Sequence, residues 1–366
     1  MKEIKIKKTD VFNFIIVFCL IFYKYFLMWN QKLSLNLNLN IMIIYILILT
    51  ILMVSRKKIK KNLVLKLTIM IIFFVISYYK SEAIDILIAF VISFCFFDDD
   101  VGEQKFLKNF VISSSIMFII TIILFVLGIL PDNTLQRWNG NTTIVRSSLG
   151  FFHANSPFLY FIPIVLAYYI LKKDNLKKFP FLLIVDIISV IIYHFTICRT
   201  GLIVIIGINL CVLFEKYLIK NKIMNFTTKH GYLIFLMISV IIALKYGLDF
   251  VSPINNLLSM RPYYYYLAIT QYGFHLFGAG VQDLIIIDNV YLTYTLIYGI
   301  VPFALFLLFQ YKTFHRFKGN KMMIVMFLFF IYGMLENNFV YCNNFMLTLQ
   351  FIFYLQNKEV IKDVKN

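Results

Sequence analysis

Long apolar segments separated by short polar connectors are the main pattern along the 366 residues of the chain. A bilayer span needs about 20 mostly apolar residues, and hydrocarbon offers no partner to an unpaired backbone amide, so such a segment must be helical. The pattern predicts an all-α polytopic integral membrane protein, with a single domain over residues 1–366 and about twelve transmembrane helices. The predicted spans are 11–29, 37–55, 62–79, 83–97, 108–130, 156–171, 179–198, 201–218, 231–247, 289–311, 322–340 and 343–356.

Composition supports the membrane class over a soluble one. The chain is 61% hydrophobic and 14% charged, whereas soluble domains average ~45–50% apolar and ~25% charged residues. Its five cysteines never form a CxxC pair, which argues against a disulfide framework and a zinc site. The first apolar segment is not followed by a small-residue cleavage site, so we expect it to be retained as the first span.

The positive charge of the chain is unevenly distributed between the predicted connectors. With both termini in the cytoplasm, 26 of the 35 Lys and Arg residues fall on the cytoplasmic side and seven on the external side. This asymmetry is what the positive-inside rule expects. The net charge of +17 is therefore an orientation signal, and nucleic acid is not an expected partner.

Two predicted extracytoplasmic loops, at about 131–155 and 248–288, are longer than a turn. Most of the arginines are external in this topology, although most of the lysines are cytoplasmic. The external arginines are Arg137, Arg146, Arg199 and Arg261. Arginine presents a planar fork suited to bidentate phosphate binding. The excess of arginine over lysine on the external side therefore predicts an anionic ligand there.

The segment RSSLGFFHAN, residues 146–155, combines three polar side chains just before an apolar span. Arg146 can bind a phosphate, and His153 can act as a general base. The competing interpretation is a polar connector with an interfacial histidine. The residues alone leave these two interpretations open.

Two further external segments place an arginine beside an apolar span. Arg199, in the sequence CRTG, either snorkels to lipid headgroups or points into a cavity, and the tight turn favours the cavity. Arg261 precedes four consecutive tyrosines. Tyrosines at this position are typical of an aromatic belt, whereas Arg261 itself is a candidate for substrate binding.

The residues that precede the predicted span 289–311 have both structural and chemical interpretations. Asp288 or Asn289 is a natural N-cap for that helix, and the same position can direct a carboxylate into an external cavity. The glycines of LFGAG, residues 276–280, are expected to allow a turn or a close backbone approach rather than to bind a dinucleotide. His153 and His275 form no ligand cluster, so no metal is expected.

The order of these motifs resembles that of Wzy-type polysaccharide polymerases of the O-antigen polymerase/ligase superfamily. The resemblance covers residues 146–300 and rests on RSSLGFFHAN, CRTG, LFGAG, IDNVYL and IYGI. Cys198 and Ala154 depart from the usual serine and proline of that family.

The resemblance implies a GT-C-like, metal-independent membrane glycosyltransferase without a cofactor, in the bacterial plasma membrane. Its substrate is an undecaprenyl-pyrophosphate-linked oligosaccharide, and membrane lipids, a flippase and a chain-length regulator of the same pathway are further expected partners. His153 and then Asp288 are the candidate catalytic bases. The candidate substrate-binding residues are Arg146, Arg199, Arg261, Asn155 and Asn289.

Two alternatives remain. A ligase of the same superfamily transfers finished glycan to another acceptor and shares the donor and leaving group. A lipid-linked oligosaccharide flippase or other transporter is the second alternative, since Asp186 and His194 lie inside a predicted span and ionisable residues there are often functional.

Overall fold

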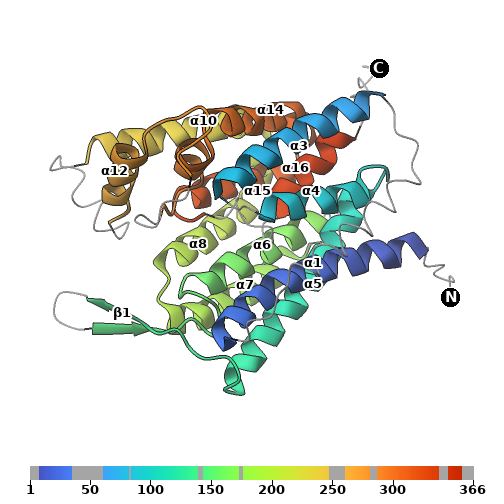
Figure 1. Ribbon diagram of the computed structural model, residues 1–366. Coiled ribbons are helices and arrows are strands. Elements are labelled where there is room, and N and C mark those ends of the chain that lie inside the picture. Colours follow the sequence, from blue (N-terminus) through green and yellow to red (C-terminus); the bar gives the residue numbers. More distant parts are fainter. Residues whose placement is uncertain are drawn as a thin grey trace, which may run out of the picture. The chain divides into compact units, whose positions relative to one another are not determined.

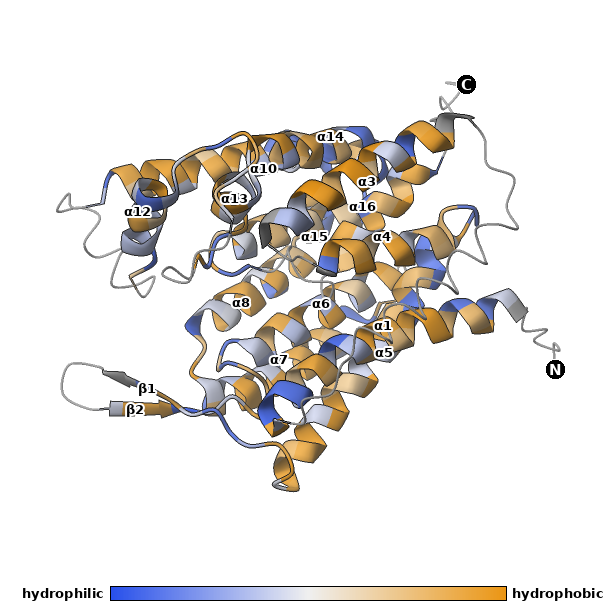
Figure 2. Cartoon of the chain, in the orientation of Figure 1, coloured by the Kyte–Doolittle hydropathy of each residue, from blue (hydrophilic) through white to orange (hydrophobic). Residues whose placement is uncertain are grey.

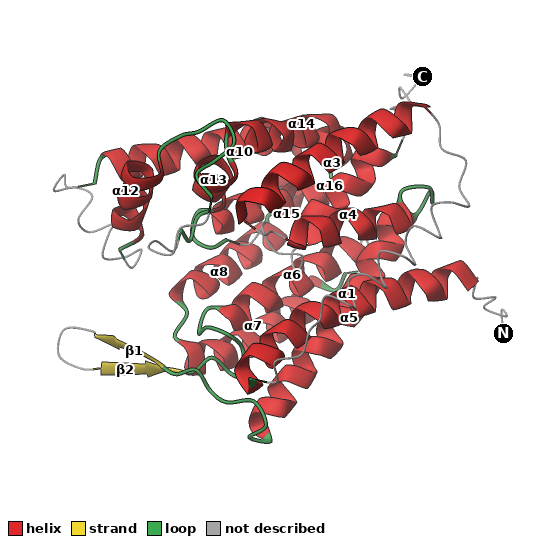
Figure 3. Cartoon of the chain, viewed as in Figure 1, coloured by secondary structure: helices red, strands yellow, loops and turns green. Residues whose placement is uncertain are grey.

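The computed structural model shows a chain built mostly of helices (Figures 1 and 3). It describes residues 8–34, 61–81, 84–138, 143–172, 176–246, 260–280, 287–337 and 345–356. The chain divides into two compact units. Unit 1 contains Met1–Lys58 and Val91–Leu213, and unit 2 contains Ile59–Phe90 and Phe214–Asn366. The expectation of one domain over 1–366 stays a prediction.

Unit 1 is a bundle in which neighbouring helices share buried faces. Helix α5 packs against α1 and α6, and α6 packs in turn against α7 and α8. A Cβ atom on Gly201 would lie 2.2 Å from the Phe158 ring, so the glycine of CRTG is what lets α8 approach α6 closely. The helices are α1 (Lys8–Leu33), α5 (Gly102–Val126), α6 (Ser156–Leu171), α7 (Lys178–Thr196) and α8 (Arg199–Leu213).

Unit 2 is organised around α10, which packs against α12, α13, α14 and α15. Its core is aromatic: the ring of Tyr232 lies 4.3 Å from that of Phe306 and 4.8 Å from that of Phe330, centroid to centroid. Helix α4 (Ile84–Phe96) begins in unit 2 and ends in unit 1. The other elements are α3 (Lys61–Ser81), α9 (Glu215–Lys220), α10 (Lys222–Leu244), α12 (Arg261–Tyr272), α13 (Val290–Leu292), the π-helix η2 (Thr293–Tyr298), α14 (Ile300–Phe317), α15 (Lys321–Gly333) and α16 (Phe345–Leu355).

Within the described ranges, four helices are long and apolar enough to cross a membrane: α1, α5, α7 and α10. Six shorter apolar helices accompany them, and apolar residues dominate the helices of both units (Figure 2). The outward face of α7 is itself apolar, since Ile184 and Val190 are 58% and 62% exposed. Such a face suits lipid and not water, so the helices have the character of a membrane protein.

Several predicted spans differ from the observed helices at their ends. The span predicted at 231–247 starts earlier, at Lys222, and the span predicted at 322–340 ends at Gly333. The span predicted at 201–218 also ends early, at Leu213. The predicted span 37–55 lies outside the described residues.

The structure is mostly helical, as predicted, and it adds regular structure within both segments that the sequence assigned to larger loops. A two-stranded antiparallel hairpin, β1 (Leu135–Trp138) with β2 (Thr143–Arg146), occupies the first loop, and Leu135 pairs with Arg146. Helix α12 occupies part of the second. The tyrosine run is its first turns, and successive tyrosines therefore face different directions: Tyr265 is 1% exposed and Tyr264 is 45% exposed.

The predicted span 289–311 is not one continuous helix. It is interrupted at Gly299, whose φ of +110° favours glycine. The loop 275–280 binds the backbone groups exposed by the break: Ala279 N–H donates to Leu296 O at 2.8 Å, and Ile300 N–H donates to His275 O at 3.0 Å. A Cβ atom on Gly278 would lie 2.1 Å from Ile297 O. The expected close backbone approach at the LFGAG glycines is thus confirmed.

Candidate functional site

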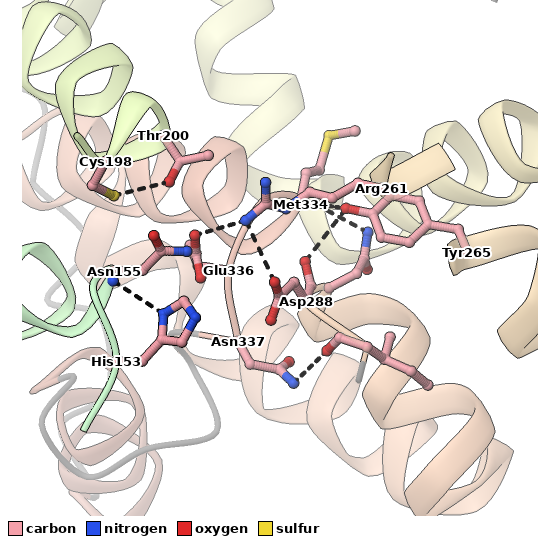
Figure 4. Close-up of polar contacts among 12 residues, drawn as sticks. His153, Asn155, Cys198, Thr200, Arg261, Tyr265, Asp288, Met334, Glu336 and Asn337 are labelled. Carbon is pink, nitrogen blue, oxygen red and sulfur yellow. Dashed lines mark hydrogen bonds and ion pairs between the residues drawn. The ribbon is translucent and has the colours of Figure 1, made fainter. Parts of the chain in front are cut away.

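The candidate residues fall into two clusters, one in each unit, and each is described by itself (Figure 4). The Arg146 cluster comprises Arg146, His153, Asn155, Thr196 and Arg199 of unit 1. The Arg261 cluster comprises Arg261, Tyr265, Asp288, Asn289 and Glu336 of unit 2. Figure 4 labels His153 and Asn155 of the first cluster and most of the second.

Arg146 is the last residue of β2, and two hydrogen bonds fix its guanidinium. Nε donates to the backbone oxygen of Thr196 at 2.7 Å, and Nη2 donates to Oδ1 of Asn155 at 2.6 Å. Ser147 N–H also donates to Phe195 O at 2.9 Å, which attaches this segment to the C-terminal end of α7. Both acceptors, a backbone oxygen and an amide oxygen, are uncharged, so these two bonds orient the guanidinium without offsetting its charge.

His153 is exposed, and its contacts determine which ring nitrogen can accept a proton. The backbone N–H of Asn155 donates to Nδ1 of His153 at 3.1 Å. In the neutral ring, one nitrogen accepts and the other carries the proton. Neutral His153 therefore presents Nε2–H as a donor, which suits hydrogen bonding to a substrate oxygen better than proton abstraction.

Asn155 is the N-cap residue of α6 but makes no side-chain capping hydrogen bond. Its side chain accepts from Arg146 instead. Asn155 occupies a natural capping position, but its side chain hydrogen-bonds Arg146 and not the backbone of α6.

Arg199 is the first residue of α8, and its side chain is exposed. The side chain is therefore not enclosed, and the expectation that the tight turn directs it into a cavity stays a prediction. The turn directs Cys198 inward instead, where Sγ lies 3.4 Å from Oγ1 of Thr200. Within the described part of the chain, no carboxylate forms an ion pair with Arg199, so its charge is available to a ligand.

The connector around Ser148 holds the RSSLGFFHAN segment in place. Oδ1 of Asp132 accepts from the Ser148 N–H at 2.7 Å and from its hydroxyl at 2.9 Å. Nζ of Lys32 donates to Pro131 O at 2.7 Å. Ser148 is fully buried, so this part of the motif has a structural role.

Arg261, in the first turn of α12, is buried between two carboxylates of unit 2. Its Nη2 lies 2.8 Å from Oε1 of Glu336 and 3.4 Å from Oδ2 of Asp288. The side chains of Arg261 and Glu336 are 8% and 4% exposed, whereas that of Asp288 is 39% exposed. The arginine therefore lies in the interior between one enclosed acid and one acid that reaches the surface.

Partial burial raises the pKa of Asp288 above its usual value, and the neighbouring Arg261 partly offsets that effect. Loss of water solvation disfavours the charged carboxylate, whereas a nearby cation favours it. A carboxylate that is accessible and has a raised pKa is a better proton acceptor near neutral pH than an ordinary surface aspartate. Asp288 therefore has the properties of a general base.

Asn289 is fully buried and is the N-cap of α13. Its Oδ1 accepts from the N–H groups of Tyr291 and Leu292 at 3.0 Å each, and its Nδ2 donates to Oγ of Ser239 at 2.9 Å. The capping interpretation of this position is confirmed for Asn289. Both the oxygen and the nitrogen of the side-chain amide are thus engaged within the protein.

Tyr265 supports the carbonyl groups that surround the cluster. Its hydroxyl hydrogen-bonds Met334 O and lies 3.3 Å from Asp288 O. Burial raises the pKa of Tyr265, so this hydroxyl stays a neutral donor. It fixes the backbone on both sides of Arg261.

Glu336 was missed by reasoning from the sequence, although a signal was present. It lies inside the predicted span 322–340, and an acidic residue in an apolar span is a functional candidate by default. The structure shows that α15 ends at Gly333, so Glu336 belongs to the connector that follows the helix.

Asp186 and His194, both on α7, differ in their surroundings. Nδ2 of Asn209 on α8 donates to Oδ1 of Asp186 at 2.7 Å. His194 is exposed and lies edge-on to the Phe195 ring. An amide paired with a carboxylate inside an apolar bundle is also a common way to join membrane helices.

Across the described residues, no group of three or more His, Cys, Asp or Glu side chains is arranged to hold a metal ion. Comparison of the chain with protein-family models, with curated proteins and with solved structures gave no match in any of the three. The functional assignment therefore rests on the two clusters and on the motifs that compose them.

Proposed function

We propose that the protein is a membrane glycosyltransferase that polymerises undecaprenyl-pyrophosphate-linked oligosaccharide repeat units into a surface polysaccharide. The topology proposed with it has about twelve spans, both termini in the cytoplasm of a bacterium and both clusters on the external side of the plasma membrane. The observation that carries the proposal is Asp288, an accessible carboxylate whose pKa is raised by burial and which is held by Arg261. Glycosyl transfer to a sugar hydroxyl requires such a base.

In the proposed reaction, the acceptor hydroxyl oxygen attacks the anomeric carbon of the lipid-linked chain. The hydroxyl proton passes to Asp288, and the bond between the anomeric carbon and the pyrophosphate oxygen breaks. The leaving pyrophosphate takes the electron pair. Arginines oriented toward that developing charge stabilise the transition state.

Arg199 and Arg146 of unit 1 are the proposed ligands for a phosphate group of the lipid-linked substrate. Arg199 is exposed, and the two hydrogen bonds described for Arg146 go to uncharged acceptors. His153, in the same segment as Arg146, is a further proposed contact for a phosphate or sugar oxygen. Arg261 is a weaker candidate for this role than the sequence suggested, since two carboxylates already accompany it.

The test uses purified protein in proteoliposomes, supplied with lipid-linked single repeat units. Wild-type protein is expected to produce a ladder of longer glycans. Arg199→Ala is expected to reduce the yield by about 10²–10³-fold, by analogy with loss of one oxyanion donor. Arg199→Lys, which keeps the charge but not the fork, is the matched control and should retain more activity. A ladder of unchanged length and yield from Arg199→Ala would contradict the role of Arg199.

The same assay separates the alternatives. A ligase would transfer preformed chains to a second acceptor and leave single repeat units unextended. The observation that supports a flippase is the hydrogen-bonded pair Asp186 and Asn209, which joins α7 and α8. It would move repeat units across the bilayer without changing their length.

A further inference from the structure

The second carboxylate of the Arg261 cluster has no role in the reaction described above. Glu336 is almost completely enclosed and lies 0.6 Å closer to Nη2 of Arg261 than Asp288 does, at 2.8 Å against 3.4 Å. Ion pairs enclosed in this way rarely improve stability over apolar residues of the same size. The position of the Arg261–Glu336 pair beside the accessible carboxylate of Asp288 therefore suggests that the pair affects the chemistry of Asp288 rather than the stability of the fold.

We propose that Glu336 is a positioning residue, which holds Arg261 and limits how strongly that arginine stabilises the ionised form of Asp288. This inference rests on the proposed function, because Asp288 is the base of that reaction. Glu336 touches neither the substrate nor the reacting atoms and acts only through Arg261.

The geometry explains how one arginine can serve both acids. Nη2 carries two hydrogens, and it is the nitrogen nearest to both carboxylates. The shorter, enclosed contact fixes the guanidinium, and the longer contact leaves Asp288 less tightly held. A full bidentate contact with Asp288 would favour its ionised form and weaken it as a base.

Among the described residues, the ionisable groups that lie against Asp288 come from two elements. Arg261 and Tyr265 belong to α12, and Glu336 follows α15. Helix α10, packed against α12, contributes the neutral hydroxyl of Ser239 through Asn289. Tyr265 stays neutral, so Glu336 is the group whose charge can adjust the effect of Arg261 on Asp288.

Glu336→Gln removes that charge with little change of shape. The positive charge of Arg261 then acts on Asp288 without the opposing charge of Glu336, which favours the ionised carboxylate of Asp288. We expect the pH at which Asp288 is half ionised to fall. We also expect polymer formation above that pH to decrease several-fold, since a weaker base accepts the hydroxyl proton less readily.

The experiment is an infrared titration of purified protein from about pH 4 to pH 8. The carbonyl band of protonated Asp288 is identified by its loss in Asp288→Asn. A midpoint lower in Glu336→Gln than in wild type is the expected result, and Glu336→Asp should restore a midpoint close to that of wild type. Glu215→Gln is the matched control, since Glu215 pairs with Lys321 at 3.8 Å elsewhere in unit 2 and should leave the midpoint unchanged.

A midpoint that does not move in folded Glu336→Gln would overturn the proposal and leave Glu336 a structural residue. The titration needs no substrate, so its result is independent of whether the protein makes polymer. Failure of the proposed function would appear separately, as a wild-type protein that titrates normally and extends no repeat units.

Discussion

Arg146 and Arg261 are both anchored arginines, but their partners differ in charge. Arg146 donates to an amide oxygen and a backbone carbonyl in unit 1, whereas Arg261 lies between two carboxylates in unit 2. An uncharged acceptor orients a guanidinium without offsetting its charge. Carboxylates offset that charge. Arginines that look alike in the sequence can therefore have different surroundings in the structure.

The same contrast extends to the two candidate bases. Nδ1 of His153 already accepts a backbone N–H, so its remaining nitrogen is a donor. The Asp288 carboxylate is accessible, and partial burial raises its pKa. We therefore propose Asp288 as the base, whereas the sequence places His153 first and Asp288 second.

The largest expected effect comes from substituting each candidate base separately and comparing the two losses of activity. Asp288→Asn should lower the rate of polymer formation by about 10²–10⁴-fold, the usual contribution of a general base. His153→Gln keeps a donor and should lower the rate far less. Initial rates in proteoliposomes, compared at equal amounts of folded protein, test both. A larger loss in His153→Gln than in Asp288→Asn would reverse the assignment.

A second difference should appear in the stability of the two clusters. Glu336→Ala leaves the charge of Arg261 enclosed without its nearest partner, and such a change costs about 3–5 kcal/mol of unfolding free energy. Asn155→Ala removes one hydrogen bond from a half-buried arginine and should cost only about 0.5–1.5 kcal/mol. Unfolding in detergent, followed by far-ultraviolet circular dichroism because both tryptophans lie in unit 1, measures both variants. Equal losses would show that the partners of the two arginines are energetically alike.

The sequence indicated much of the helical architecture but little of the interior of the clusters. Most of the predicted spans correspond to helices, because long apolar runs have few alternatives in a bilayer. The break at Gly299 was not predicted, since apolar periodicity continues through it and only the contacts of the loop 275–280 make the break possible. The helix over the tyrosine run was also missed, because tyrosines at a membrane boundary are typical of a belt.

Pairings between distant residues were the part that sequence could not provide. Arg146 and Asn155 are close in the chain, and their grouping was predicted as one motif. Arg261 and Glu336 are 75 residues apart, and no spacing rule connects them. The members of the Arg261 cluster could therefore be identified only from the folded structure, whereas the residues of RSSLGFFHAN are adjacent in the sequence and could be grouped from it.

A single substitution can make the first cluster resemble the second. Asn155→Asp places a carboxylate where the amide oxygen now accepts from Nη2 of Arg146 at 2.6 Å. The new ion pair should maintain or slightly increase stability. Pyrophosphate affinity should nevertheless fall by about 10–100-fold, since a charge-assisted hydrogen bond contributes about 1.5–3 kcal/mol.

Calorimetric titration with a soluble prenyl pyrophosphate analogue measures that affinity, with Asn155→Gln as the uncharged control. Unchanged affinity in a folded Asn155→Asp protein would mean that Arg146 does not bind the phosphate. Loss of affinity in both variants would point to the shape of the site rather than its charge.

The smallest expected effect is a difference in unfolding free energy between substitutions of two asparagines, which both cap helices of unit 2. Asn289 accepts from two N–H groups of α13 and also donates to Ser239, and it is fully buried. Asn221 accepts from two N–H groups of α10 but lies at the exposed surface. Capping substitutions to alanine cost about 0.5–2 kcal/mol, so Asn289→Ala should fall near the upper end and Asn221→Ala near the lower end. The same unfolding measurement distinguishes them. If Asn289→Ala instead left stability unchanged but weakened binding of the repeat unit, Asn289 would be a substrate ligand, as the sequence first suggested, and the enclosed position described above would not persist when substrate binds.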